Sequence, residues 1–202
     1  MERLTGKETL NLLNRTVIFI GPEGSGKTTI AKQLAQESGR PYITTGDILR
    51  DLADNDDGPL GEDCRQMFNE SRYLSGEKLL EILANRFSQE DTSHGWILDG
   101  GLRTLEETVG FQDMLGSAGR PFSVTVVHLQ IPREMSMERL VTGDNARKRD
   151  RDTEEGVNSR LDKFYDQLDE RVAQILEHGY EIIEIDATQP VEVVYSAVKE
   201  SL

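Results

Sequence analysis

Short apolar runs alternate with longer stretches of helical periodicity along this chain. The runs lie at Val17 to Ile20, Tyr42 to Thr44, Trp96 to Leu98, Val124 to Ile131 and Ile182 to Ile185. Continuous apolar runs of this length are typical of strands buried on both faces of a sheet. Helical patterns separate them at about residues 28–37, 60–69, 77–88, 106–115, 134–141, 157–177 and 191–201. The alternation predicts a doubly wound α/β fold, with a five-stranded parallel sheet, right-handed crossovers and helices on both faces.

A chain of 202 residues is long enough for one such domain with small insertions. The hydrophobic fraction of 36% and the charged fraction of 30% are typical of a soluble globular protein, and no apolar stretch is long enough to span a bilayer. Residues 1–14 precede the first strand, carry no motif and lack the apolar core of a secretory signal. We therefore expect an N-terminal extension over residues 1–14, one domain over residues 15–202, a cytoplasmic location and a monomer.

The formal net charge of −14 argues against nucleic acid and anionic membranes as partners, because both surfaces repel an acidic protein. An anionic ligand then needs a locally basic site. Cys64 stands alone, which leaves neither a disulfide framework nor a cysteine zinc site and predicts a buried small side chain. The acidic run from Asp51 to Asp57 is interpreted as a solvated loop, since its spacing fits no calcium-binding loop.

The residues from Gly21 to Thr28 read Gly-Pro-Glu-Gly-Ser-Gly-Lys-Thr and match the phosphate-binding loop GxxxxGK[ST]. They follow the first apolar run and precede a helical pattern. A glycine-rich turn in this position directs backbone N–H groups and a helix N-terminus at one point, which is a ready anion site. Lys27 is expected to reach the β- and γ-phosphates of a nucleotide, and Thr28 to ligate Mg²⁺. The expected nucleotide contacts in this loop are Gly24, Ser25, Gly26, Lys27, Thr28 and Thr29.

A phosphate-binding loop occurs in many classes of protein, and four further segments restrict the choice among them. They are the stretch from Ile43 to Arg50, the stretch from Asp99 to Thr104, the stretch from Leu129 to Leu140, and Arg149-Asp150-Arg151-Asp152-Thr153-Glu154-Glu155 running on to Arg160. Together with the phosphate loop and the segment from Asp186 to Pro190, they make the chain resemble the adenylate kinase family of nucleoside monophosphate kinases. The resemblance covers almost all of the chain after Thr16 and implies the P-loop NTPase version of the α/β fold.

The resemblance implies roles for five arginines and one lysine. Phosphoryl transfer between two nucleotides brings several anionic groups together, and arginine suits them because its planar fork binds phosphate oxygens bidentately and stays charged. Arg50 and Arg103 are expected to hold the acceptor phosphate. Arg139, Arg149 and Arg160 are expected to close over the donor and transferring phosphates. With Lys27, the residues Arg103, Arg139, Arg149 and Arg160 form the expected catalytic set.

Other expected contacts complete the implied site. Arg139 and Gln189 would contact the donor nucleotide, and Asp99 at the end of an apolar run would orient Mg²⁺ with Thr28, partly through water. The acceptor side would comprise Thr45, Arg50, Leu74, Gly100, Arg103, Glu107, Arg149 and Arg160. An acceptor-binding insertion is expected at about residues 44–74. The lid, at about residues 139–152, is short and free of cysteine, so we expect the family's short-lid form without structural zinc.

The chain departs from the family pattern at four places. Gly101 and Leu102 replace the phenylalanine and proline of Gly-Phe-Pro-Arg, which predicts a more mobile acceptor loop. Gly143 stands where many members carry a lid arginine, and Arg151 and Asp152 stand where they carry paired aspartates. Arg147 or Arg151 is a candidate to compensate for the missing charge. Glu107 replaces a glutamine that reads the adenine edge. A carboxylate accepts hydrogen bonds but does not donate them, so Glu107 suits guanine, which offers two adjacent donors, better than adenine. Thr45, in contrast, favours adenine.

The leading interpretation is a Mg²⁺-dependent phosphotransferase that uses ATP and a nucleoside monophosphate, with AMP favoured and GMP, CMP or UMP as alternatives. No general base is expected, because the acceptor phosphate's second pKa is about 6. Three other readings remain open. They are a small-molecule kinase with a hydroxyl acceptor, a degenerate nucleotide-binding module without turnover, and a GTPase switch, for which no guanine signature is found.

Overall fold

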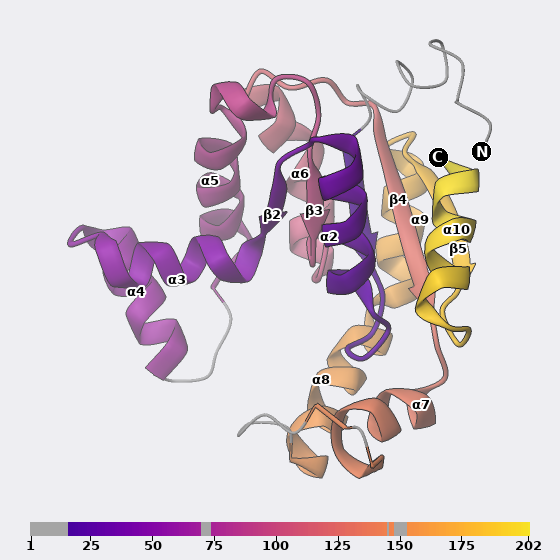
Figure 1. Ribbon diagram of the computed structural model, residues 1–202. Helices are drawn as coiled ribbons and strands as arrows, with labels where there is room; N and C mark the ends of the chain where they lie inside the picture. Colours follow the sequence, from indigo (N-terminus) through magenta and orange to yellow (C-terminus); the bar gives the residue numbers. More distant parts are fainter. Residues whose placement is uncertain (1–15, 70–73, 145, 148–152) are drawn as a thin grey trace.

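A computed structural model describes residues 16–69, 74–144, 146–147 and 153–202 (Figure 1). Over this part of the chain, five parallel strands form one sheet in the order β2-β3-β1-β4-β5. The strands are β1 (Thr16–Ile20), β2 (Tyr42–Thr44), β3 (Ile97–Asp99), β4 (Val124–Gln130) and β5 (Glu181–Asp186). All five predicted strands and their parallel pairing are confirmed.

The two faces of the sheet pack against two separate hydrophobic cores. Val17 and Phe19 point into the core beneath α2 (Lys27–Ser38) and α10 (Val191–Ser201), while Ile18 and Ile20 point into the core on the other side. The second core is covered by α5 (Gly76–Phe87), α6 (Leu105–Ser117) and α9 (Leu168–Glu177). This alternation follows from the two-residue period of a strand, and it accounts for the apolar side chains at all four positions from Val17 to Ile20.

Because β1 lies between β3 and β4, the connections leave β1 toward opposite edges of the sheet. Ligands of open α/β sheets bind at the carboxyl ends of the strands at such a point. In Figure 1, α3 (Thr45–Asn55) and α4 (Pro59–Asn69) extend from the β2 edge, whereas α7 (Arg133–Met137) and α8 (Glu154–Asp166) lie below the carboxyl end of β4. The remaining short helices are η1 (Glu90–Thr92) and η2 (Glu138–Thr142).

The acidic run was predicted as a loop, and this prediction is wrong for Asp51 and Asp54, which lie within α3. The helix starts at a Thr44 side chain that accepts a hydrogen bond from the Asp47 N–H at 2.9 Å. Its buried side includes Leu49, while the acidic side chains occupy the solvent side. Helical spacing of apolar residues therefore outweighs the acidic composition.

The single helix predicted over residues 157–177 is also wrong, because Gln167 separates α8 from α9 with φ of −113° and ψ of 7°. The Arg171 guanidinium donates to the carbonyl oxygens of Phe164 at 2.6 Å and Gln167 at 3.2 Å. The Gln167 carbonyl also accepts from the backbone N–H of Arg171 at 3.0 Å, so the guanidinium adds its hydrogen bonds to the backbone bonding at this break.

Cys64 is fully buried in the core, as predicted. Among the described residues, no helix is both long enough and apolar enough to cross a membrane. The expected N-terminal extension lies outside the described residues.

Candidate active site

The glycine-rich segment forms a tight loop between β1 and α2. Gly21, at φ of +146°, passes so close to β4 that a Cβ there would lie 2.5 Å from the Leu129 carbonyl oxygen. Gly26 is the N-cap of α2 and has no side chain with which to cap it. The first N–H groups of α2 are thus available to an anion, as the motif predicts.

The Lys27 ammonium lies over this loop and donates to the carbonyl oxygens of Gly21 at 2.7 Å and Pro22 at 2.8 Å. It also approaches the Ser25 hydroxyl at 3.4 Å. Thr29 follows in the first turn of α2, where its N–H donates to the Gly26 carbonyl at 3.0 Å. The loop therefore holds a positive charge at its centre.

Burial lowers the pKa of Lys27 from 10.5 to about 8. The charges of Arg103 and Arg147 act in the same direction, while those of Asp99 and Glu23 oppose them. Two arginines far apart in the sequence thus lie close enough to Lys27 to disfavour a further positive charge. Such a concentration of cations suits a ligand with several negative charges.

Asp99, at the end of β3, joins the loop through its side chain. Its Oδ2 accepts hydrogen bonds from the Thr28 hydroxyl at 2.6 Å and from the Tyr42 hydroxyl at 2.8 Å. A hydroxyl and a carboxylate beside a phosphate site are oxygen ligands of the kind that Mg²⁺ prefers. No group of three or more His, Cys, Asp or Glu side chains that could hold a metal occurs in the described part of the chain. Mg²⁺ does not require one, because it keeps several waters and binds substrate phosphates.

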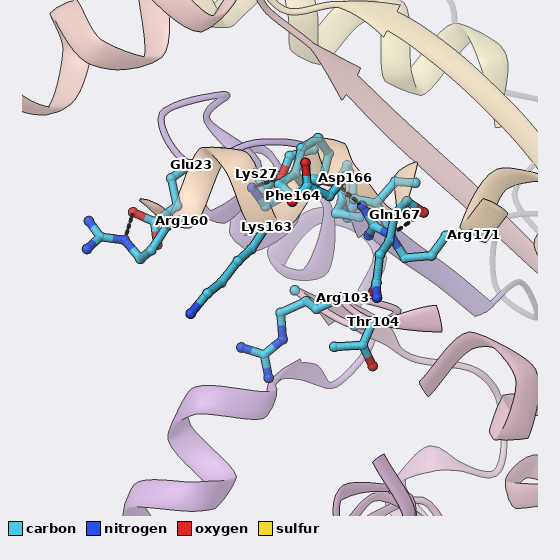
Figure 2. Close-up of a pocket in the computed structure, with 15 residues that line it drawn as sticks. Glu23, Lys27, Arg103, Thr104, Arg160, Lys163, Phe164, Asp166, Gln167 and Arg171 are labelled. Atoms are coloured by element: carbon cyan, nitrogen blue, oxygen red, sulfur yellow. Dashed lines mark hydrogen bonds and ion pairs between the residues drawn. The ribbon is translucent and has the colours of Figure 1, made fainter. Parts of the chain in front are cut away.

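A cavity of about 420 Å³ extends from the loop to α8 and α9 (Figure 2). It brings together four of the predicted residues, Lys27, Gly100, Arg103 and Arg160. The remaining lining residues are Phe19, Ile20, Gly21, Glu23, Gly101, Thr104, Lys163, Phe164, Asp166, Gln167 and Arg171. Figure 2 shows the Arg103 side chain directed from one side toward the same space as Lys163 from α8.

Glu23 bridges the loop to the opposite wall. Its Oε2 lies 3.0 Å from Arg160 Nε and 3.4 Å from an Arg147 guanidinium nitrogen. Sequence reasoning gave Glu23 no role, although an acidic residue within a phosphate loop is a detectable signal. Its carboxylate therefore forms ion pairs with two arginines that would also bind the oxygen atoms of a phosphate.

Arg139 connects two loops at the edge of the site. Its guanidinium donates to the Gly24 carbonyl at 3.0 Å and to the Ala187 carbonyl at 3.1 Å. Gln189 lies nearby in the sequence, and its amide donates to Asp186 at 3.4 Å. The structure thus places Arg139 against the phosphate loop, beside the segment that was expected to contact the donor nucleotide.

Four predicted acceptor residues lie outside the lining of this cavity. The Thr45 hydroxyl donates to the Gly100 carbonyl at 3.4 Å, which ties the start of α3 to the end of β3. Arg50 pairs with Asp47 on the exposed side of α3. Leu74 is half-buried and packs against the core. The predictions for Arg149 and for the lid from residue 148 to residue 152 fall outside the described residues.

Glu107 is the fourth of these residues, and it is only 4% exposed. Its Oε2 accepts a hydrogen bond from the backbone N–H of Arg103 at 2.9 Å. Burial raises the pKa of this carboxyl, and the neighbouring charges of Arg103 and Arg171 act against that rise. The carboxylate expected to read the acceptor base is thus bonded to the backbone of the acceptor loop.

Comparison with known proteins supplies the family. The family model described as adenylate kinase matches residues 19–180. The chain belongs to the adenylate kinase family.

Similar proteins cover almost the whole chain. The adenylate kinase of Trichodesmium erythraeum is 31% identical over 191 residues, which span 92% of this chain and 96% of the relative. Adenylate kinase 1 of Synechocystis sp. is 33% identical over 179 residues, spanning 88% and 91%. The adenylate kinase of Methanosarcina mazei is 30% identical over 213 aligned residues, spanning 92% and 97%.

This adenylate kinase family member has an acceptor loop that the family motif does not fit. Leu102 has φ of +52°, which a proline ring forbids. A Cβ on Gly101 would lie 2.3 Å from a Leu98 methyl carbon, so a phenylalanine here would require the buried Leu98 side chain to shift. The Leu102 side chain is 1% exposed and packs in the core. These contacts oppose the mobility expected from the loss of proline.

The missing lid arginine of the adenylate kinase pattern also has a local cause. Gly143 closes the wide turn of η2, where its N–H donates to the Glu138 carbonyl at 2.8 Å. A Cβ at this position would lie 2.7 Å from that carbonyl oxygen. Arg147 forms an ion pair with Glu23 of the phosphate loop, and its compensating role stays a prediction.

Proposed function

We propose that this protein transfers the γ-phosphoryl group of ATP to AMP, giving two ADP, with Mg²⁺ as cofactor. The observation that carries the proposal is the single cavity shared by the phosphate-loop Lys27 and by Arg103 and Arg160 from two other segments. Family membership and the name adenylate kinase of the relatives support AMP as the acceptor.

The donor phosphates would bind along the loop from Gly24 to Thr29, with Lys27 on the β- and γ-phosphates and with Arg139 and Gln189 toward the rest of the nucleotide. Thr28 and Asp99 would hold Mg²⁺, which would supply positive charge to offset that of the phosphates. The uncapped N-terminus of α2 adds its partial positive charge. These groups lower the repulsion between the donor and an incoming anion.

On the acceptor side, Arg103 and Arg50 would hold the AMP phosphate, with Arg160 and Arg149 over the group in transfer. Thr45, Leu74 and Gly100 would surround the acceptor nucleoside. We assign residues 44–74 to an acceptor-binding insertion and residues 139–152 to a short lid that excludes water. Fixed arginines stabilise the charge that spreads over the transferring group, so no side chain has to act as a base.

The proposed site is complete within one chain, so activity requires no second subunit. The net charge of −14 supports the exclusion of nucleic acid and anionic membranes as partners. We place the protein in the cytoplasm, where its nucleotide substrates are found.

The test is a coupled assay of ADP formation with ATP, Mg²⁺ and each of AMP, GMP, CMP and UMP in turn. We expect turnover that depends on AMP and is highest with AMP. The Arg103→Met variant should lose at least tenfold in kcat/KM for AMP, since it lacks one charged phosphate contact. Turnover highest with another monophosphate would reassign the acceptor, and none with any of them would refute the phosphotransferase.

A further inference from the structure

The acceptor loop holds a bulky residue in an unfavourable backbone conformation. Leu102 has φ of +52°, in the left-handed region that side chains with a Cβ rarely adopt. Such conformations persist only where surrounding contacts impose them, and they cluster at functional sites. Leu102 directly precedes Arg103, which lines the cavity.

Arg171, on α9, imposes this conformation from one side. It is 1% exposed, and its guanidinium donates to the Leu102 carbonyl at 2.8 Å. The same group holds the carbonyl oxygens of Phe164 and Gln167, and it lies over the Phe164 ring at 4.9 Å. Five fixed donors in a plane let one arginine join the acceptor loop to the break between α8 and α9.

Glu107, on α6, holds the next peptide from the other side. Its carboxylate accepts from the Arg103 N–H at 2.9 Å, while its own N–H donates to the Thr104 hydroxyl at 3.1 Å. Thr104 is the N-cap of α6. In an ordinary capping box the Glu107 carboxylate would accept from the N–H of this residue, whereas here it accepts from the N–H one residue earlier. The charges of Glu107 and Arg171 also stabilise each other, because each favours the ionised form of the other.

The direction of the Arg103 side chain depends on this backbone. Its Nε is buried and has no hydrogen-bond partner among the described residues. The side chain is therefore oriented mainly by the φ and ψ angles of its own loop. A change of peptide orientation at Leu102 would move the guanidinium within the cavity.

We propose that Arg171 and Glu107 are positioning residues that fix the Leu102–Arg103 peptide and thereby aim the Arg103 guanidinium at the acceptor phosphate. This inference rests on the proposed function, since it requires Arg103 to bind AMP. It gives Glu107 a different role from reading the base. The pair also accounts for an acceptor loop that holds its shape without the proline of the family motif.

The first test compares Arg171→Met with Arg120→Met. Arg120 is a matched control, because its guanidinium also donates to backbone carbonyls, including that of Gln89 at 2.7 Å, and it does not line the cavity. Both variants should lose thermal stability. Only Arg171→Met should raise KM for AMP, by about tenfold or more, with KM for ATP changed less than threefold. Arg171→Lys should recover part of the AMP affinity, since one ammonium can reach one of the three carbonyls.

The second test concerns Glu107 and stands if Arg171→Met fails to fold. Glu107→Met removes the acceptor of the Arg103 N–H and should raise KM for AMP about tenfold. Glu107→Gln keeps an oxygen that accepts this bond, so its KM for AMP should stay within about threefold of the parent value. If Glu107 instead reads the base, Glu107→Gln should bind AMP more tightly and should shift the preference between AMP and GMP.

The outcomes separate the two proposals. An unmodified protein without AMP-dependent turnover refutes the proposed function. An active protein whose Arg171→Met and Glu107→Met variants fold and keep the parent KM for AMP refutes the positioning role. Equal effects of Arg171→Met and Arg120→Met on KM for AMP refute it as well.

Discussion

The Lys27 ammonium group is buried, yet its function requires a positive charge. It must carry charge to meet phosphate, yet burial beside other cations lowers its pKa to about 8. The carbonyl oxygens of Gly21 and Pro22 hold it in place, and the charges of Asp99 and Glu23 partly offset the lowering of its pKa. At neutral pH the group is still mostly charged, and above about pH 8 the free site can gain a proton when an anion enters.

We expect ATP binding above pH 8 to take up a proton at Lys27. The neutral amine predominates there in the free protein, and the phosphate oxygens raise its pKa again, so the complex holds more protons than the free protein. Calorimetric titrations in two buffers of different ionisation enthalpy should give an uptake of roughly half a proton or more at about pH 8.5. Lys27→Arg remains charged at this pH and should show no uptake. Equal proton counts for the two proteins would contradict the assignment.

At the scale of elements, the strands were predictable because their runs are predominantly apolar and short. The run predicted from Trp96 to Leu98 is displaced by one residue from β3, where Asp99 closes the strand at the site. Helix α3 was missed because Asp51 and Asp54 were read by composition and not by spacing. At the break between α8 and α9, the Arg171 guanidinium bonds the nearby Phe164 and Gln167 carbonyls and also the distant Leu102 carbonyl. The helical pattern alone does not reveal this contact with Leu102.

The candidate site, too, was predictable from the sequence only in part. Lys27, Arg103 and Arg160 were found through motifs, whose spacing survives without knowledge of the fold. The bond from the Arg103 N–H to Glu107 was not found, since it depends on the path of the loop. Residue types alone did not indicate whether Glu107 faces a ligand or the backbone.

The corner between α3 and α4 should tolerate no side chain at Gly61. A Cβ there would lie 1.8 Å from the Asp56 carbonyl oxygen, so Gly61→Ala must force the two helices apart. We expect a loss of about 1–3 kcal/mol in the free energy of unfolding by denaturant titration. Gly116→Ala, in α6, is the control. Its Cβ meets only the Phe122 ring at 3.6 Å, so higher helix propensity should leave stability unchanged or raise it by up to about 1 kcal/mol. Equal stabilities of the two variants would contradict this packing.

At the scale of the whole molecule, Glu23 joins the phosphate loop to α8 and to the segment at Arg147. Its carboxylate stands in competition with phosphate oxygens for Arg160 and Arg147. Both ion pairs are partly exposed, so each contributes little to stability, and salt screens them. Their effect should therefore be seen in nucleotide affinity more than in folding.

We expect Glu23→Gln to bind ATP more tightly, by about threefold to tenfold, because a neutral amide competes less with phosphate. The gain should shrink as ionic strength rises. Calorimetric titration with ATP at low and at high salt would measure this gain in affinity and its dependence on ionic strength. The control is Glu37→Gln, because the Glu37 carboxylate pairs with Lys199 at the C-terminal end of α2, away from the phosphate loop. This variant should leave ATP affinity unchanged. Weaker ATP binding in Glu23→Gln would show that the carboxylate assists the nucleotide.

In the proposed reaction, one cavity transfers a phosphoryl group between two nucleotides. This transfer can be followed with γ-labelled ATP in the presence of Mg²⁺ and unlabelled AMP. We expect the label in the β-position of the ADP formed from AMP, and we expect Arg103→Met to slow this transfer at least tenfold. Label released as inorganic phosphate, with none in ADP, would contradict it.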